Sequence, residues 1–280
     1  MPKKFLAALA ALAAAFGLAL SAAPAQASTG GAPDGDAHAG AALIVNYTAQ
    51  GRFRCSAALV SPTVLLTAAH CTDGTLGRTL VVFDSVIAEQ PPAGFPAAAD
   101  RSVGYTSADL AGRISGTAYT DPQFSHFTDQ DNWNDVGVIV LDTPVSLPTY
   151  PIAAAGTLDA LAPGDIPKTT VTAVGYGAEL DKPESGPQRR VPMTFPLLRR
   201  SVDLRAQQVE PQILVTHANV NPGRGTGGIC FGDSGGPVFL DNAIVGVTSF
   251  GNSKCLAHDG IQRVDIAPVQ AWLAGFGVKP

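Results

Sequence analysis

Short apolar runs separated by turn residues constrain the fold of this chain more than any other feature. Two such runs, Pro237–Leu240 and Ile244–Phe250, are joined by the polar turn Asp241-Asn242, which is the pattern of a β-hairpin. Glycine and proline, 30 and 22 of 280 residues, are too frequent for a helix bundle. Tight turns at this spacing indicate β-barrels or sandwiches instead of alternating strands and helices.

The runs fall into two halves joined by a proline-punctuated crossing segment, residues 143–164. We predict barrel regions at about 40–147 and 165–264 and a short terminal helix at about 265–275, because apolar residues recur at helical spacing after Asp265. The strands predicted in the first half are Ala41–Tyr47, Gly51–Val60, Thr63–Cys71, Leu80–Phe83, Ser85–Glu89, Leu110–Tyr119 and Val136–Leu141.

The first 27 residues have the pattern of a secretory signal peptide. Lys3 and Lys4 precede an apolar run from Phe5 to Leu20, and Ala25-Gln26-Ala27 fits the small-x-small cleavage rule. The apolar run is shorter than the roughly 20 residues that a membrane span needs. We therefore expect cleavage after Ala27, a secreted mature chain of residues 28–280, and no membrane anchor.

The net charge indicates which partners the chain can bind, and the cysteines indicate an oxidising compartment. Removing Lys3 and Lys4 takes the formal net charge from −5 to −7, and phosphate binding needs a basic face, so nucleic acid is not an expected partner. The four cysteines are an even number in a secreted chain. They are therefore expected to form two disulfides.

The stretch Gly227–Pro237 (GGICFGDSGGP) places Ser234 among glycines, on a loop ahead of a strand. Glycine permits tight turns and close approach of another molecule, and loops held by a β scaffold often carry catalytic groups. A serine hydroxyl becomes a good nucleophile only when a base takes its proton. The chain must therefore supply that base.

His70 is the best candidate for the base, because it ends the apolar run Thr63–Cys71. Alone it would be read as a hydrogen-bonded core histidine. The other histidines have no partner motif and are interpreted as surface or loop residues: His38, His126, His217 and His258.

An imidazole base needs a carboxylate that holds its tautomer and stabilises its charged form. Asp135 directly precedes the apolar run Val136–Leu141, where a partly desolvated carboxylate would be held rigidly. An aspartate that opens a strand can also be a plain turn residue. Asp129, Asp131 and Asp142 are nearby competitors.

The motifs Thr67–Cys71, Asp135 before an apolar strand, and Gly232–Pro237, in this order, resemble the chymotrypsin-like (trypsin-type) serine proteases. The resemblance covers nearly all of the mature chain. It implies an all-β fold of two packed six-stranded antiparallel Greek-key β-barrels with a short C-terminal helix. It also implies a serine endopeptidase that works through an acyl-enzyme, with Ser234 as nucleophile, His70 as base and then acid, and Asp135 as orienting carboxylate.

The same resemblance implies further features of the site. The backbone N–H groups of Gly232 and Ser234 would form the oxyanion hole, and Gly228 would lie at the base of the specificity pocket. No metal or cofactor is expected, the substrates would be proteins or peptides, and we expect a monomer of the bacterial secreted branch. The implied disulfides are Cys55–Cys71 and Cys230–Cys255, and the implied substrate-pairing residues are Ser249, Phe250 and Gly251.

Two positions depart from the family pattern. Family members begin with a β-branched apolar residue whose amino group inserts beside the aspartate before the nucleophile, whereas Ser28 would occupy that place beside Asp233. Signal cleavage after Ala27 would itself create this amine. At the pocket base, Gly228 supplies no carboxylate, so we expect a neutral pocket for Phe, Tyr, Leu or Met. An inward Asp259 would restore a preference for Lys or Arg.

Two other functions fit parts of the sequence. Gly232-x-Ser234-x-Gly236 matches the nucleophile elbow of α/β-hydrolases, but that fold needs a base downstream, where only His258 is available, and a helix after the serine. A protease-fold binding protein without catalysis is the second alternative. The complete set of catalytic residues argues against it, and the unusual Ser28 argues faintly for it.

Overall fold

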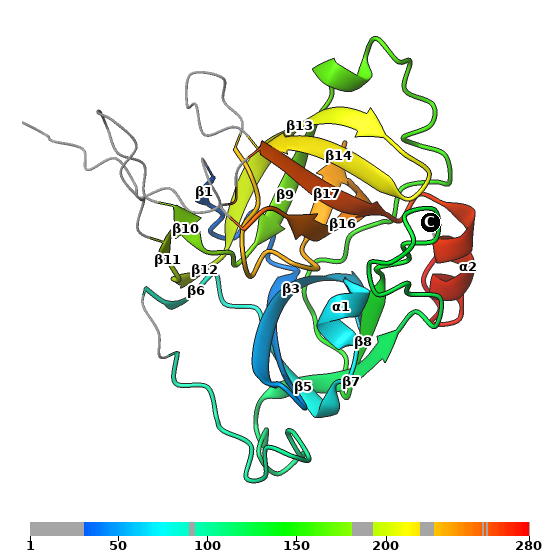
Figure 1. Cartoon of the computed structure of the whole chain (residues 1–280). Coiled ribbons are helices and arrows are strands. Elements are labelled where there is room, and N and C mark those ends of the chain that lie inside the picture. The colour runs from blue at the N-terminus through cyan, green and yellow to red at the C-terminus, as the bar shows by residue number, and fades with distance from the viewer. Residues whose placement is uncertain are drawn as a thin grey trace, which may run out of the picture.

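Two closed, six-stranded antiparallel barrels stack on each other, the first built from the N-terminal half and the second from the C-terminal half (Figure 1). The computed structural model describes residues 31–89, 93–180, 193–218, 227–253, 255 and 257–279. The predicted all-β, two-barrel fold is confirmed. The predicted signal peptide, residues 1–27, lies outside the described residues. No helix in the described ranges is long and apolar enough to cross a membrane.

The first barrel encloses a core of aliphatic side chains, among them Leu59, Leu65 and Ile139, which are fully buried. A predicted strand over residues 110–119 is wrong at its start. Residues 110–113 form a turn in which Gly112 has a φ of +74°, so the extended backbone begins only at Ile114. The strands, in barrel order, are β2 (Ala41–Thr48), β3 (Gly51–Ser61), β4 (Val64–Thr67), β8 (Gly137–Leu141), β7 (Ile114–Thr120) and β5 (Leu76–Val82).

The second barrel closes through the pairing of its first strand, β9, with β13. Along β13 buried and solvent-facing residues alternate, as expected for a strand with one face on the core. In barrel order the strands are β9 (Thr170–Gly175), β13 (Arg200–Val209), β14 (Ile213–Ala218), β17 (Ala257–Arg263), β16 (Ala243–Gly251) and β15 (Pro237–Leu240). Short strands flank the barrels: β1 (Ala32–Pro33), β6 (Val86–Ala88), β10 (Glu179–Leu180), β11 (Met193–Thr194) and β12 (Leu197–Leu198).

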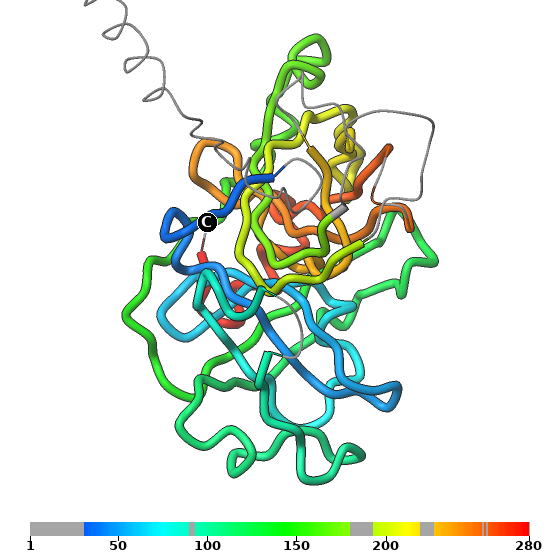
Figure 2. The backbone as a smooth tube through the Cα atoms, turned by 90° about the vertical axis from the view of Figure 1, so that its left-hand side faces the viewer, coloured from blue at the N-terminus to red at the C-terminus, as the bar shows by residue number. Residues whose placement is uncertain are grey.

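The terminal helix α2 (Ala267–Ala274) follows the second barrel in sequence and packs where the two barrels meet. Its Val269 and Leu273 are buried in a core cluster that contains residues of both barrels, and Phe276 lies 5.4 Å from Tyr119 of β7 between ring centroids. The tube in Figure 2 shows the two barrels one above the other, with the red C-terminal segment near their junction. The chain thus ends by fastening the two barrels together.

Asp265, which was expected to begin this helix, does not cap it. The Asp265 carboxylate accepts hydrogen bonds from the Arg263 guanidinium and from the Leu158 N–H. The helix begins at Ala267 without a side-chain cap. The Asp265 carboxylate therefore binds Arg263 and Leu158 instead of the N–H groups at the start of the helix.

A buried arginine ties the chain's first described segment to both barrels. Arg199 is 1% exposed, and its Nε lies 3.0 Å from Asp34 Oδ2. Its guanidinium also donates to the carbonyls of Ala41 and Phe83 and to the Tyr176 hydroxyl. A charge so far from water is tolerated only because its hydrogen-bonding groups find such partners.

A variant without the Arg199 charge should therefore be less stable against unfolding. We expect Arg199→Met to lower the free energy of unfolding by about 3–5 kcal/mol, because the buried Asp34 charge would lose its arginine and keep only its contacts with His38. Urea unfolding in a Ser234→Ala background, which suppresses self-digestion, measures this. The control is Lys168→Ala, which breaks an exposed ion pair with Asp165 and should change little. Equal midpoints for the two variants would contradict the assignment.

Candidate active site

His70 and Asp135 are hydrogen-bonded to each other twice. The His70 backbone N–H donates to Asp135 Oδ1 over 2.8 Å, and His70 Nδ1 lies 2.8 Å from Asp135 Oδ2. The pairing of β4 with β8, with Thr67 opposite Gly137, brings the two residues together. His70 does not end a strand as predicted: β4 stops at Thr67, and His70 lies in the one-turn helix α1 (Ala69–Thr72).

Two of the competing aspartates have other partners, and the third, Asp131, is exposed. Asp142 pairs with Arg78 over 2.8 Å, and Asp129 accepts hydrogen bonds from the Asp131 N–H and the Asn132 side chain of its own loop. Asp135 is fully buried. The geometry therefore selects Asp135 from the candidates that the sequence left open.

Groups from the second barrel hold the Asp135 segment. The Ser249 hydroxyl donates to Asp135 Oδ2 over 2.6 Å, and Trp133 Nε1 donates to Ser249 Oγ over 2.9 Å. The Asp135 N–H donates to Gln262 Oε1 over 2.9 Å. Sequence reasoning assigned Ser249 only to substrate pairing and missed Trp133 and Gln262. No local motif marks them, because their contacts arise from the packing of the two barrels.

The loop that carries Ser234 needs a glycine at 232. Gly232 has a φ of +102°, and a Cβ built there would lie 2.9 Å from the Tyr176 carbonyl oxygen. Ser56 of β3 clamps the loop: its N–H donates to the Ser234 carbonyl and its hydroxyl to the Gly232 carbonyl, each over 2.8 Å. Ser56 is a second residue that sequence reasoning missed.

Two backbone N–H groups beside the Ser234 side chain have no hydrogen-bond acceptor among the described residues. Within the described ranges, neither the Gly232 N–H nor the Ser234 N–H donates to an acceptor. Unsatisfied N–H groups of this kind stabilise an oxygen that gains negative charge. The loop can therefore bind an oxyanion next to a hydroxyl nucleophile.

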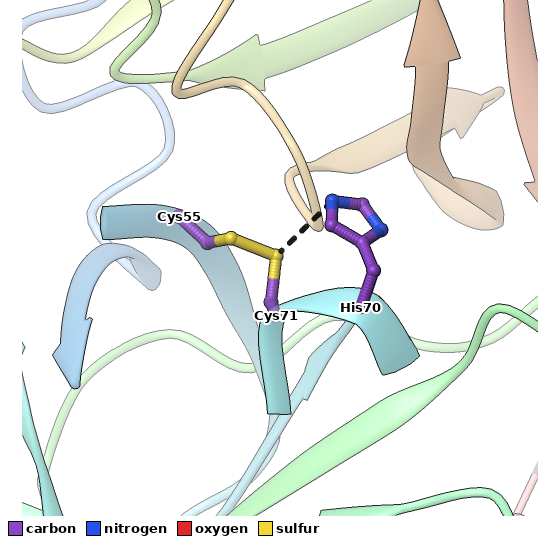
Figure 3. Close-up of side chains that lie close together, drawn as sticks. All are labelled: Cys55, His70 and Cys71. Carbon is purple, nitrogen blue, oxygen red and sulfur yellow. Dashed lines mark hydrogen bonds between the residues drawn. A yellow bond between two sulfur atoms is a disulfide. The ribbon is translucent and has the colours of Figure 1, made fainter. Parts of the chain in front are cut away.

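Ser234 and His70 line the same two cavities but are not hydrogen-bonded to each other among the described contacts. His70 Nε2 instead lies 3.6 Å from Cys71 Sγ, as the dashed line in Figure 3 shows. Hydrogen bonds between catalytic groups are often long without substrate and tighten when it binds.

The sulfurs beside His70 do not make a metal site. Cys55, His70 and Cys71 bring ligand-type atoms within 4.8 Å of one another, but Cys55 and Cys71 are joined as a disulfide (Figure 3). Metal binding requires thiolate sulfur. The second disulfide, Cys230–Cys255, lies beside the nucleophile loop, so the structure contains both pairs that the resemblance implies. Two disulfides fit an oxidising compartment.

Asp233 turns its carboxylate away from the two cavities and into the protein. It is 3% exposed and accepts hydrogen bonds from the N–H groups of Gly177 and Cys230, over 2.8 and 2.9 Å. Ser28, whose amino group is predicted to pair with Asp233, lies outside the described residues. That pairing stays a prediction.

The smaller cavity, about 240 Å³, has the position of a specificity pocket, with Ile229, Gly251 and Ser234 among its lining residues. Asp259 lies directly behind it: a Cβ built at Gly251 would be 2.9 Å from Asp259 Oδ1, and one at Gly228 would be 3.4 Å from Oδ2. Oδ2 accepts the Ile229 N–H over 3.0 Å, and buried Oδ1 has no hydrogen-bond partner.

Burial raises the pKa of Asp259 to about 7, with a further increase from the charge of Asp233. The expectation of a neutral pocket rested on the lack of a carboxylate at Gly228, on apolar Ile229 and on open space at Gly251. In the structure Asp259 is fully buried beside Gly228 and Gly251, which is the inward orientation considered as the alternative.

The backbone from Ser249 to Gly251 has one edge that no strand in the described part of the chain covers. The pairing of β15 with β16 ends at Val247, whereas β17 covers the opposite edge as far as Gly251. An extended peptide can add to such an edge through main-chain hydrogen bonds. Phe250, 41% exposed, flanks the edge and packs on Trp133.

Comparison with known proteins agrees with this geometry. The trypsin family model matches residues 31–273. The chain belongs to the trypsin family. It is 28% identical to a trypsin of Saccharopolyspora erythraea over 213 residues, covering 74% of this chain and 80% of that protein. It is 30% identical to brachyurin of Leptuca pugilator over 208 residues, covering 70% and 75% of the two chains.

A solved structure, HL collagenase, superposes with a TM-score of 0.60 at 17% identity and covers 91% of this chain and 100% of its own. This likeness shows the fold alone. The protein is thus a trypsin-family serine endopeptidase, of a family that acts on proteins or peptides. The resemblance seen in the sequence is confirmed, and the α/β-hydrolase alternative is wrong because the fold is two β-barrels.

The support of Asp135 by Ser249 can be tested directly. Ser249→Ala removes a hydrogen bond to a buried carboxylate, and such bonds contribute about 1.5–3 kcal/mol. We expect kcat/KM for a short peptide amide to fall by about tenfold or more, with Ser102→Ala, an exposed serine, as the unchanged control. A folded Ser249→Ala enzyme with full activity would show that the hydroxyl does not position the carboxylate.

Proposed function

We propose that this protein is a secreted serine endopeptidase that cleaves peptide bonds through an acyl-enzyme on Ser234. His70 would be the general base and Asp135 the carboxylate that orients it. The observation that carries the proposal is the pair of unused N–H donors, Gly232 and Ser234, beside a serine that shares its cavities with His70. The N-terminal signal pattern and the two disulfides support secretion.

Each atom of the reaction has a place in this arrangement. Ser234 Oγ bonds to the substrate carbonyl carbon as its proton passes to His70 Nε2, and the carbonyl oxygen becomes an anion held by the two N–H groups. The imidazolium, stabilised by Asp135, then protonates the leaving amine, and the C–N bond breaks. Water repeats the sequence on the ester and releases Ser234.

The same donors weigh against a binding protein without catalysis. Binding of a partner requires no free N–H pair beside a serine. It also requires no buried carboxylate aligned twice on one histidine. Both features are needed only if negative and positive charges develop during a reaction.

Replacement of the nucleophile tests this proposal. We expect Ser234→Ala to abolish peptide hydrolysis and labelling by a fluorophosphonate, which reacts with activated serines, while the fold is kept. Ser102→Ala should be labelled as the unaltered enzyme is. Equal hydrolysis by the unaltered enzyme and a folded Ser234→Ala variant would refute the assignment.

We further propose that the smaller cavity accepts two classes of side chain before the cleaved bond. A neutral Asp259 suits apolar side chains, and an ionised Asp259 provides a counter-charge for Lys or Arg, whose burial without one is costly. Because the pKa of Asp259 is raised to about 7, the carboxyl is neutral below this pH and charged above it. The preference for a basic residue should therefore grow as the pH rises.

The ratio of kcat/KM for matched Arg and Leu substrates tests this, because any pH effect that is common to both substrates cancels. We expect the Arg:Leu ratio to rise by about tenfold or more through pH 7 in the unaltered enzyme. In Asp259→Asn it should stay low and flat. A flat ratio in the unaltered enzyme, or a persistent Arg preference in Asp259→Asn, would contradict the role of Asp259.

A further inference from the structure

A second, larger cavity of about 700 Å³ lies on the other side of Ser234 and His70 from the specificity pocket. The two cavities share only His70, Phe127, Phe231 and Ser234 in their linings. If the acyl half of a substrate occupies the specificity pocket and the open edge of β16, the departing half must lie in this second cavity, hereafter the leaving-group cleft. This step rests on the proposed function.

Three phenylalanines give the leaving-group cleft an apolar wall. Phe53 of β3 is 50% exposed, Phe231 is 54% exposed and Phe195 is 42% exposed. They come from three separate segments and converge on one cavity that also holds the nucleophile. Large exposed apolar surface gathered in this way is typical of a binding site.

A guanidinium that makes no side-chain hydrogen bond or ion pair within the described ranges lines the same cavity. It belongs to Arg54, which is half-buried. A Cβ built at Gly232 would lie 3.5 Å from Arg54 Nε, which puts the guanidinium beside the nucleophile loop. Burial lowers the pKa of Arg54, so the charge is held at a cost that an anion in the cleft would relieve.

The other charged groups of the cleft are less suited than Arg54 to bind an anion. Arg52, at the rim, adds a second positive charge and donates to the Pro96 carbonyl. The single carboxylate of the lining is Asp73, which lies 3.5 Å from His126 Nδ1 on the helix α1 side. Asp233 interacts with Arg54 electrostatically, but its carboxylate accepts N–H groups inside the protein.

We infer that the leaving-group cleft selects substrates with an acidic side chain within the first two residues after the cleaved bond, next to a large apolar one. Arg54 would bind the carboxylate, and the phenylalanines would hold the apolar neighbour. A guanidinium can meet a carboxylate with two parallel hydrogen bonds, which an amide of the same shape cannot replace. Glu should therefore be preferred to Gln at that position.

Partitioning of the acyl-enzyme isolates the cleft from the rest of the site. An ester substrate acylates Ser234, and its alcohol departs. A dipeptide amide then competes with water: its amine bonds to the acyl carbon, the Ser234 ester bond breaks, and the amine's proton returns to Ser234 through His70. The ratio of peptide to acid product measures binding in the cleft alone. The probes are Phe-Glu-amide, Phe-Gln-amide, Glu-Phe-amide and Gln-Phe-amide.

In the unaltered enzyme we expect one Glu probe to exceed its Gln counterpart by about tenfold or more in this ratio. Arg54→Gln should remove that difference, Arg54→Lys should keep part of it, and the exposed Arg101→Gln should keep all of it. Phe53→Ala should lower the ratio for both probes of the preferred pair while their Glu:Gln difference remains.

Equal partitioning of both Glu and Gln pairs in the unaltered enzyme would overturn the inference, even if Arg54 variants failed to fold. A Glu preference that survives in Arg54→Gln would overturn it as well. A complete lack of ester turnover and of fluorophosphonate labelling would overturn the proposed function together with it. Normal ester turnover with equal partitioning would overturn the inference about the cleft alone.

Discussion

The buried carboxylate of Asp135 is the constraint on which the rest of the site depends. An ionised group without water is tolerated only when donors surround it, and here the donors come from both barrels: His70 from the first and Ser249 from the second. Any shift between the barrels would leave a charge unsatisfied. The need to satisfy Asp135 thus holds the base in place and fixes the relation of the two barrels at the cleft.

A second set of contacts crosses the same junction and positions the nucleophile. Ser56 of the first barrel holds the carbonyls of Gly232 and Ser234 and accepts the Tyr176 N–H. Asp233 and Gly235 donate their N–H groups to the carbonyls of Cys230 and Thr248, whereas the N–H groups of Gly232 and Ser234 have no acceptor in the described part of the chain. The proposed catalytic arrangement depends on the interface, because neither barrel contains all of its residues.

Two unlike cavities meet at Ser234. One has a carboxylate behind it, Asp259, and the other has an unpartnered guanidinium, Arg54, among phenylalanines. Opposite charges on the two sides of Ser234 would favour substrates with a basic residue before the cleaved bond and an acidic residue after it. Recognition would then depend on the order of residues around that bond as well as on a single side chain.

The sequence by itself determined the fold class, the family and the identities of His70, Asp135 and Ser234 as candidates, because these depend on turn residues, apolar runs and short motifs. It also indicated that the glycines around Ser234 permit a tight turn, and Gly232 has a φ of +102°. Only the tertiary structure decided which residues far apart in the sequence come into contact. Ser249, Gln262 and Ser56 act across the barrel interface. The inward orientation of Asp259 depends instead on the register of the neighbouring strands β16 and β17. Contacts between segments a hundred or more residues apart leave no local pattern, since packing alone selects them.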